Sequence, residues 1–269
     1  MSIFQSIILG IVQGLTEFLP VSSSAHLVLV PWWLGWPEPS LAFDTLLHWG
    51  TLLAVVSFFW RDWVDMFVAV VNRLRGRRDP EGRDRLLLLI AVATVPAALA
   101  GYLFKDFFES IFGAPGIIGF FLIVTGFLLL VAERWPRGHK PLLGVRLLDA
   151  ILIGLMQAVA ILPGISRSGS TMSAGMMRGF DRPTAARFSF LMSAPIIFGA
   201  GLTQLPDMLK QGASGSAVAL VLGFLAAAIT GFLTIRFLLR YLQTNTFYPF
   251  IIYVWIFGGA TVLRALLMR

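Results

Sequence analysis

The sequence predicts an all-α integral membrane protein with six membrane-spanning helices and two re-entrant helix hairpins, arranged as an inverted-topology repeat. Hydrophobic residues make up 57% of the 269 positions and charged residues 13%, with a mean hydropathy of +0.82. Soluble domains carry about a quarter charged residues, so this chain has too little polar surface for water. The other two observations are a set of apolar segments of membrane-spanning length and two apolar regions interrupted by similar loops.

The first interrupted region covers residues 1–34, and "LPVSSSAH" (19–26) lies within it. Proline in an apolar segment ends or kinks a helix, so we expect two short helices joined by a loop. The region 146–178 has the same character around "LPGISRSGS" (162–170). Non-helical backbone at membrane depth is tolerated only where it is buried in protein or lines a wet cavity. The two loops are therefore predicted to belong to a functional site.

Six uninterrupted apolar segments are each long enough to cross a bilayer, which takes about 20 residues of helix. The segment 63–74 has a mixed composition and permits either an interfacial helix or an extension of the span before it. The predicted spans are 41–60, 86–104, 115–133, 184–204, 216–236 and 247–267.

Basic residues set the predicted orientation. They concentrate in the loop 72–85 and the linker 133–146, and the positive-inside rule places both in the cytoplasm. The net charge of +7 is explained by this topology and by contact with anionic lipid, so we expect no nucleic-acid partner. The chain has no cysteine, which excludes disulfides, thiol nucleophiles and cysteine-based metal sites.

The chain is predicted to form one membrane domain built from two similar halves. "LGIVQGLTEFLPVSSS" aligns with "IGLMQAVAILPGISRS", and "PAALAG" (96–101) resembles "AAAITG" (226–231). The predicted repeats are 1–133 and 146–269, joined by a cytoplasmic linker, 134–145. Each half holds one hairpin and three spans, so the second hairpin must enter from the opposite face. Repeats of this kind place their site where broken helices meet near the bilayer midplane.

The first loop carries a polar cluster. Glu17 lies four residues after Gln13, on the same helix face, and an ionisable group at this depth is a functional candidate. Serines 22–24 cap the next helix or contact a ligand. His26, beside them, favours general acid–base chemistry. His48 and His139 lack this context and are interpreted as background.

The second loop offers an anion site. Arg167 is the one arginine expected at membrane depth, just before a helix N-terminus, where N–H groups and hydroxyls favour phosphate. Gly164 and Gly169 allow close approach of the backbone. No Lys-Ser/Thr pair follows these glycines, so the loop is not a nucleotide-binding P-loop. Apolar helices surround both loops, and the ligand that fits is a phosphate or diphosphate attached to a lipid tail.

"QGLTEFLPVSSSAH" and "LPGISRSGST" resemble the two signature motifs of bacterial undecaprenyl-diphosphate phosphatases, the bacitracin-resistance protein family. "FDTLLHWGTLLAVVSFFWRDW" and "ARFSFLMSAPIIFGAG" extend the resemblance over essentially the whole chain. It implies removal of the terminal phosphate of undecaprenyl diphosphate, which recycles the lipid carrier of cell-wall assembly. It also implies a divalent cation, Mg²⁺ or Ca²⁺, and a multi-pass protein of the bacterial inner membrane with its active site open to the periplasm.

Carried onto this chain, the resemblance implies a specific set of site residues. The family accepts Glu or Gln at the position of Gln13, and Ser24-Ala25 stands where Thr-Gly is more usual. The implied catalytic residues are Glu17, Ser23, His26 and Arg167, the implied metal ligands are Glu17 and Gln13, and the implied substrate-binding residues are Ser166 and Thr171. The polar composition of the two loops adds Ser22, Ser24, Ser168 and Gly169 as candidate substrate-binding residues.

Three questions stay open from the sequence. Ser23, a water molecule or His26 could be the group that attacks phosphorus. A transporter or flippase that moves the lipid phosphate across the bilayer is the alternative function, alone or combined with the phosphatase. The sequence also does not decide between a monomer and a homodimer.

Overall fold

The computed structural model describes residues 1–104, 107–108, 111, 113–136, 138–211 and 216–268. Residue 137 of the predicted linker lies outside this part, as do several residues of the predicted first half. Apart from an isolated bridge between Lys140 and Phe180, the regular structure in the described residues is helical. The all-α prediction is therefore confirmed.

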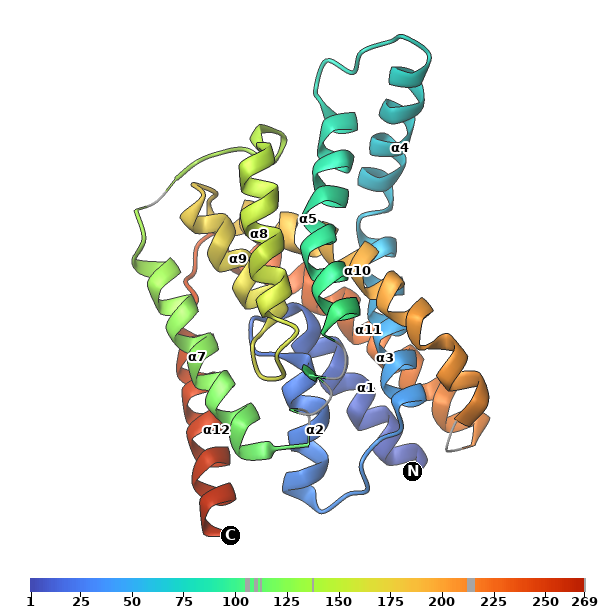
Figure 1. Ribbon diagram of the computed structural model, residues 1–269, viewed down its shortest axis with the longest axis vertical. Helices are drawn as coiled ribbons and strands as arrows, with labels where there is room; N and C mark the ends of the chain where they lie inside the picture. The colour runs from blue at the N-terminus through green and yellow to red at the C-terminus, as the bar shows by residue number, and fades with distance from the viewer. Residues whose placement is uncertain (105–106, 109–110, 112, 137, 212–215, 269) are drawn as a thin grey trace.

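The helices follow one another in the order shown in Figure 1. They are α1 (Ile3–Phe18), α2 (Ser23–Leu34), α3 (Leu41–Phe58), α4 (Trp60–Leu74), α5 (Arg83–Leu103), α7 (Pro115–Arg134), the 3₁₀ turn η1 (Leu142–Gly144), α8 (Leu147–Val159), α9 (Arg167–Met177), α10 (Arg182–Gln211), α11 (Ala217–Tyr241) and α12 (Tyr248–Leu267).

Six helices in the described part of the chain are long and apolar enough to cross a membrane. They are α3, α5, α7, the first 25 residues of α10, α11 and α12, and each corresponds to one predicted span. The prediction of six candidate spans is confirmed. By contrast, α1 and α8 are shorter apolar helices, as the interrupted regions led us to expect.

The segment 63–74 belongs to a separate helix, α4. The backbone at Phe59, with φ −98° and ψ 22°, ends α3, and α4 begins at the next residue. α4 packs along α5, at the end of the molecule away from the chain termini (Figure 1). Its exposed side carries large apolar side chains, Trp60, Val64, Phe67, Val68, Val71 and Leu74.

The two interrupted regions approach each other from opposite ends of the molecule. α1 and α2 are joined by the loop 19–22, α8 and α9 by the loop 160–166, and both loops lie in the middle of the bundle (Figure 1). α1 packs mainly on α11, whereas α8 packs on α5. Each short first helix thus contacts a long helix from the other half of the chain.

Glycines allow these crossings. A Cβ atom added at Gly10 of α1 would collide with the backbone oxygen of Gly223 in α11. A Cβ atom added at Gly154 of α8 would collide in the same way with the backbone oxygen of Ala93 in α5. Only a residue without a side chain lets the two backbones approach so closely. These crossings fix how far each loop reaches into the bundle.

Candidate active site

The two loops meet through an ion pair whose carboxylate is buried. Glu17 lies in the last turn of α1 and Arg167 is the first residue of α9. Arg167 Nη2 donates to Glu17 Oε1 at 2.6 Å, and the two side chains are 15% and 4% exposed. Beside this pair, Ser168 Oγ donates to the backbone oxygen of Leu19 at 2.9 Å. The carboxylate and the guanidinium that the sequence placed 150 residues apart are therefore in direct contact.

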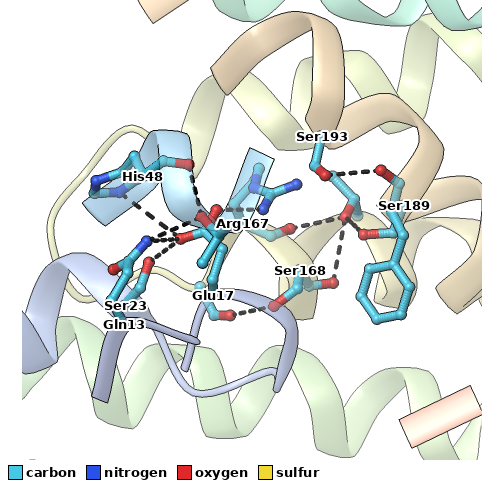
Figure 2. Close-up of polar contacts among 12 residues, drawn as sticks. Gln13, Glu17, Ser23, His48, Arg167, Ser168, Ser189 and Ser193 are labelled. Carbon is cyan, nitrogen blue, oxygen red and sulfur yellow. Dashed lines mark hydrogen bonds and ion pairs between the residues drawn. The ribbon is translucent and has the colours of Figure 1, made fainter. Parts of the chain in front are cut away.

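Glu17 Oε2 accepts two further hydrogen bonds, so both oxygens of the carboxylate have partners (Figure 2). Ser23 Oγ donates at 2.5 Å and Gln13 Nε2 at 2.9 Å. Gln13 Nε2 also lies 3.4 Å from the hydroxyl of Thr51 on α3. A serine hydroxyl that donates to a carboxylate is in position to lose its proton to that carboxylate, which is how a weak nucleophile becomes activated.

The second loop is organised by serines at the start of α9. Ser166 is the N-cap residue, and its Oγ accepts from Gly169 N at 3.1 Å. The same oxygen lies 3.1 Å from Ser168 Oγ. The N–H of Ser166 donates to Thr125 Oγ1 at 3.0 Å. These contacts hold the helix N-terminus, with its positive partial charge, next to Arg167.

Thr171 lies further along α9 and faces another helix. Its hydroxyl contacts the backbone oxygen of Arg167 at 2.8 Å and Ser189 Oγ of α10 at 2.7 Å. Figure 2 shows Ser189 and Ser193 on the side of Arg167 away from Ser23. In this structure the Thr171 hydroxyl therefore stabilises the packing of α9 on α10 and does not bond to the Glu17 cluster.

His26 is buried but bonds elsewhere. Its Nδ1 lies 2.7 Å from the backbone oxygen of Ser22 and its Nε2 lies 2.7 Å from the hydroxyl of Tyr253. The carbonyl can only accept, so Nδ1 carries the hydrogen and Nε2 accepts from the tyrosine. Both ring nitrogens are thus occupied, and Phe257 stacks on the ring at 5.0 Å between centroids. The structure brings His26 near the loop but not into contact with Glu17.

The hydrogen bond from His26 Nδ1 holds Ser22 in an unusual backbone conformation. Ser22 has φ +72°, a left-handed conformation that is uncommon for a residue with a side chain. Its hydroxyl lies 3.2 Å from the hydroxyl of Ser24. The hydrogen bond to His26 therefore fixes the sharp turn that presents Ser23 to Glu17.

Sequence reasoning missed His48, which was interpreted as background. Its Nε2 lies 3.7 Å from Glu17 Oε2, and Figure 2 shows the ring beside the carboxylate. A signal was available: Asp44, His48 and Thr51 recur at intervals of four and three, so they share one face of an otherwise apolar helix. Tyr253, the partner of His26, was missed as well and had no comparable signal.

Two buried polar atoms of the cluster have no hydrogen-bond partner among the described residues. They are Gln13 Oε1 and Arg167 Nη1. A buried donor or acceptor without a partner is costly unless a ligand satisfies it. A phosphate oxygen suits the guanidinium, and a cation suits the amide oxygen.

The donor set fits a hard divalent cation that is shared with the substrate. Mg²⁺ is commonly held by one or two carboxylates together with phosphate oxygens, and Glu17 supplies one carboxylate with the amide group of Gln13 next to it. The described residues contain no group of three His, Cys, Asp or Glu side chains that could hold a metal on their own. A metal at Glu17 and Gln13 would take its remaining ligands from phosphate and water.

Comparison with known proteins agrees with this geometry. Residues 6–260 match the family described as bacitracin resistance protein BacA. A protein of Desulforudis audaxviator named undecaprenyl-diphosphatase is 48% identical over 267 residues, which cover 99% of each chain. Proteins of the same name from Pelobacter propionicus and Moorella thermoacetica are 46% and 47% identical, over 97% and 93% of each chain. The chain belongs to the bacitracin resistance protein BacA family.

Proposed function

We propose that this protein is an undecaprenyl-diphosphatase, which hydrolyses undecaprenyl diphosphate to undecaprenyl phosphate and inorganic phosphate. The observation that carries the proposal is the cluster of Ser23 and Arg167 around the buried carboxylate of Glu17. It combines an activated hydroxyl with a phosphate-binding guanidinium inside an apolar bundle. The relatives that match nearly the full length of the chain bear the name of this activity.

Binding of the diphosphate is assigned to the second loop. Arg167 Nη1 has no hydrogen-bond partner in the described part of the chain and can donate to phosphate oxygens, and the N-terminus of α9 adds favourable dipoles. Ser166 and Gly169 shape this N-terminus through their mutual hydrogen bond. The apolar surroundings exclude water and accommodate the prenyl tail. Phosphoryl transfer depends mainly on such positioning and charge neutralisation.

The chemical step is assigned to the first loop. Ser23 Oγ attacks the terminal phosphorus while Glu17 takes the hydroxyl proton, and the bond from that phosphorus to the bridging oxygen breaks. Undecaprenyl phosphate leaves. Water then attacks the phosphoserine, Glu17 returns the proton to Ser23 Oγ, and both water hydrogens leave with the inorganic phosphate. The 2.5 Å contact between Ser23 Oγ and Glu17 Oε2 favours Ser23 over His26 as nucleophile, because both nitrogens of His26 are occupied.

A divalent cation, Mg²⁺ or Ca²⁺, would be held by Glu17 and Gln13 and would neutralise phosphate charge. In the absence of substrate, Gln13 and Glu17 are joined by a hydrogen bond. Gln13 Nε2 donates to Glu17 Oε2, and this bond orients the carboxylate for contact with Ser23 and Arg167.

We also propose that the two helix pairs are re-entrant hairpins of an inverted repeat, with halves 1–133 and 146–269. The reciprocal glycine crossings support it. The sequence alignment equates Gly10 with Gly154, and extension of the match between "PAALAG" and "AAAITG" equates Ala93 with Gly223. The Gly10–Gly223 and Gly154–Ala93 crossings are then the same contact made twice, as an internal two-fold axis requires.

The proposed location is the bacterial inner membrane, with the site open to the periplasm. The loop between α4 and α5 and the connection from α7 to α8 lie at one end of the molecule, and both termini lie at the other (Figure 1). The basic residues of those two connections favour the cytoplasm for their end. The first hairpin approaches from the end of the termini, and we therefore expect substrate to enter from the periplasmic leaflet.

Phosphate release from a prenyl diphosphate tests the proposal. The purified protein in detergent is given farnesyl diphosphate with Mg²⁺ or Ca²⁺, and the variants Glu17→Ala, Ser23→Ala and Arg167→Ala are compared with Arg83→Ala as a surface control. We expect release by the parent and the control, and a loss of about 100-fold or more in the other three. The absence of release from the parent protein would overturn the enzymatic assignment. Unchanged release by Glu17→Ala and Arg167→Ala would overturn the site.

A further inference from the structure

The ring of His48 is the polar group beside Glu17 that neither the family motifs nor the mechanism above uses. Its Nδ1 lies 2.8 Å from the backbone oxygen of Asp44, one turn earlier in α3. A carbonyl oxygen only accepts, so Nδ1 carries a hydrogen and the orientation of the ring is fixed. Nε2 then points at the cluster, 3.7 Å from Glu17 Oε2, and makes no hydrogen bond in the described part of the chain.

The backbone of α3 is tied to the first loop at the same place. Thr51 Oγ1 donates to the backbone oxygen of His48 at 2.8 Å, and Thr51 receives the 3.4 Å contact from Gln13 Nε2. Thus α3 forms a wall of the site next to α1. The position of His48 in α3 is fixed, because its ring and its backbone oxygen both make hydrogen bonds within that helix.

The two sides of the Glu17 carboxylate differ in exposure. The side chain of Glu17 is 4% exposed, that of Arg167 15% and that of His48 33%. Arg167 contacts Oε1 of the carboxylate, whereas His48 approaches Oε2. The phosphate that stays with the lipid has to remain among apolar helices, and the phosphate that is released has to reach water. The arginine side therefore suits the lipid-linked phosphate, and the more exposed histidine side suits the terminal phosphate.

We infer that His48 is a phosphate-binding residue whose Nε2 contacts the terminal phosphate group of the substrate and of the released product. The inference rests on the proposed function and deepens it. The contact forms whether the hydrogen lies on nitrogen or on a phosphate oxygen, since N–H···O and O–H···N join the same two atoms. The diphosphate then has the guanidinium of Arg167 on one side of Glu17 and His48 Nε2 on the other.

Two readouts test this assignment, one of binding and one of turnover. Binding of inorganic pyrophosphate, with Mg²⁺ present, is measured from the rise in the thermal unfolding midpoint of the protein in detergent. Turnover of farnesyl diphosphate is measured together with inhibition by inorganic phosphate. The variants are His48→Ala, His48→Phe and His48→Gln, with His139→Gln as a matched control in the linker. His48→Phe keeps the ring but has no nitrogen, whereas glutamine places an amide close to the position of Nε2.

For His48→Ala and His48→Phe we expect pyrophosphate affinity, phosphate inhibition and kcat/KM to weaken by about 10- to 100-fold, the range for a hydrogen bond to a charged group. We expect His48→Gln to stay within about threefold of the parent and His139→Gln to be unchanged. Parent-like affinity in both His48→Ala and His48→Phe would overturn the assignment. Equal losses in all three His48 variants would also overturn it, because they would point to packing of the ring.

The outcomes for His48 and for the overall activity are separable. A parent protein that binds pyrophosphate but releases no phosphate would contradict the proposed enzyme, while the loss of binding in His48→Phe would still support the phosphate contact. A parent that releases phosphate, with inhibition unchanged in His48→Phe, would contradict the contact and leave the enzyme standing.

Discussion

Removal of the guanidinium of Arg167 is expected to destabilise the fold as well as to stop catalysis. In Arg167→Ala, the carboxylate of Glu17 loses its 2.6 Å ionic partner while it stays almost fully buried. Loss of one member of a buried pair costs about 3–5 kcal/mol, because an uncompensated charge is left behind. Ser23 and Gln13 still donate to Oε2. We therefore expect the lower end of that range, about 3 kcal/mol.

A double-mutant cycle separates this pairing from the other roles of the two residues. Glu17→Gln removes the anion and leaves the partly exposed arginine without its partner, which we expect to cost about 2 kcal/mol. In Glu17→Gln/Arg167→Ala neither charge is left without a partner, because both charged groups are removed. The free energy of unfolding of the double variant should therefore also fall by only about 2 kcal/mol. The coupling energy expected from these values is about 3 kcal/mol. All three variants should remain inactive, because recovered stability does not restore a phosphate-binding group.

Denaturant unfolding in mixed micelles measures the three free energies, and phosphate release measures catalysis on the same preparations. Arg83→Ala, which breaks the exposed pair with Glu81, is the matched control and should cost less than about 1 kcal/mol. Additive losses, with coupling below about 0.5 kcal/mol, would show that the two charges are not a desolvated pair. Recovery of activity in the double variant would refute the phosphate-binding role of Arg167.

Three more predictions concern packing, charge and metal. Gly14→Ala is expected to destabilise the protein by at least about 2 kcal/mol in thermal unfolding, since its Cβ would lie 2.7 Å from the backbone of α11. The control Gly259→Ala, whose Cβ meets nothing within 4 Å, should leave the unfolding midpoint unchanged or raised. Asp149→Asn should cost about 3 kcal/mol in denaturant unfolding, because it removes the buried partner of two cations, whereas the exposed Glu81→Gln should cost under about 1 kcal/mol. Chelation should abolish phosphate release until Mg²⁺ or Ca²⁺ is returned. Gln13→Ala should raise the half-saturating metal concentration by about tenfold. Identical metal dependence in parent and variant would contradict Gln13 as a metal ligand.

The positions of the helices were largely predictable, because hydropathy alone determines which segments are long and apolar enough to cross. The six spans and the two shorter helices α1 and α8 follow from that pattern. The boundary between α3 and α4 was not predictable in the same way. The break depends on the backbone at Phe59, and the packing of α4 along α5 decides its position. Composition reveals neither this backbone conformation nor this packing contact.

The candidate site was predictable where polar and charged side chains are concentrated near the two loops. Glu17 and Arg167 are charges in apolar surroundings, and the similarity of the two loops predicted that they would meet. His48 was missed because a single histidine in an apolar helix carries no clear signal without its neighbours. The orientation of His26 was not predictable either. It depends on a hydroxyl of Tyr253, 227 residues away in the sequence.

The ion pair and the glycine crossings together explain why the site requires both halves of the chain. A carboxylate at the end of α1 is costly among apolar helices unless the guanidinium at the start of α9 reaches it. That contact depends on how deeply each loop enters, and Gly10 and Gly154 set this depth through their crossings with α11 and α5. Each first helix is thus positioned by the opposite half, while each charge is neutralised by the opposite loop. A change that shifts either helix pair therefore leaves the charge of the other loop without its ionic partner. Folding and assembly of the site are coupled for this reason.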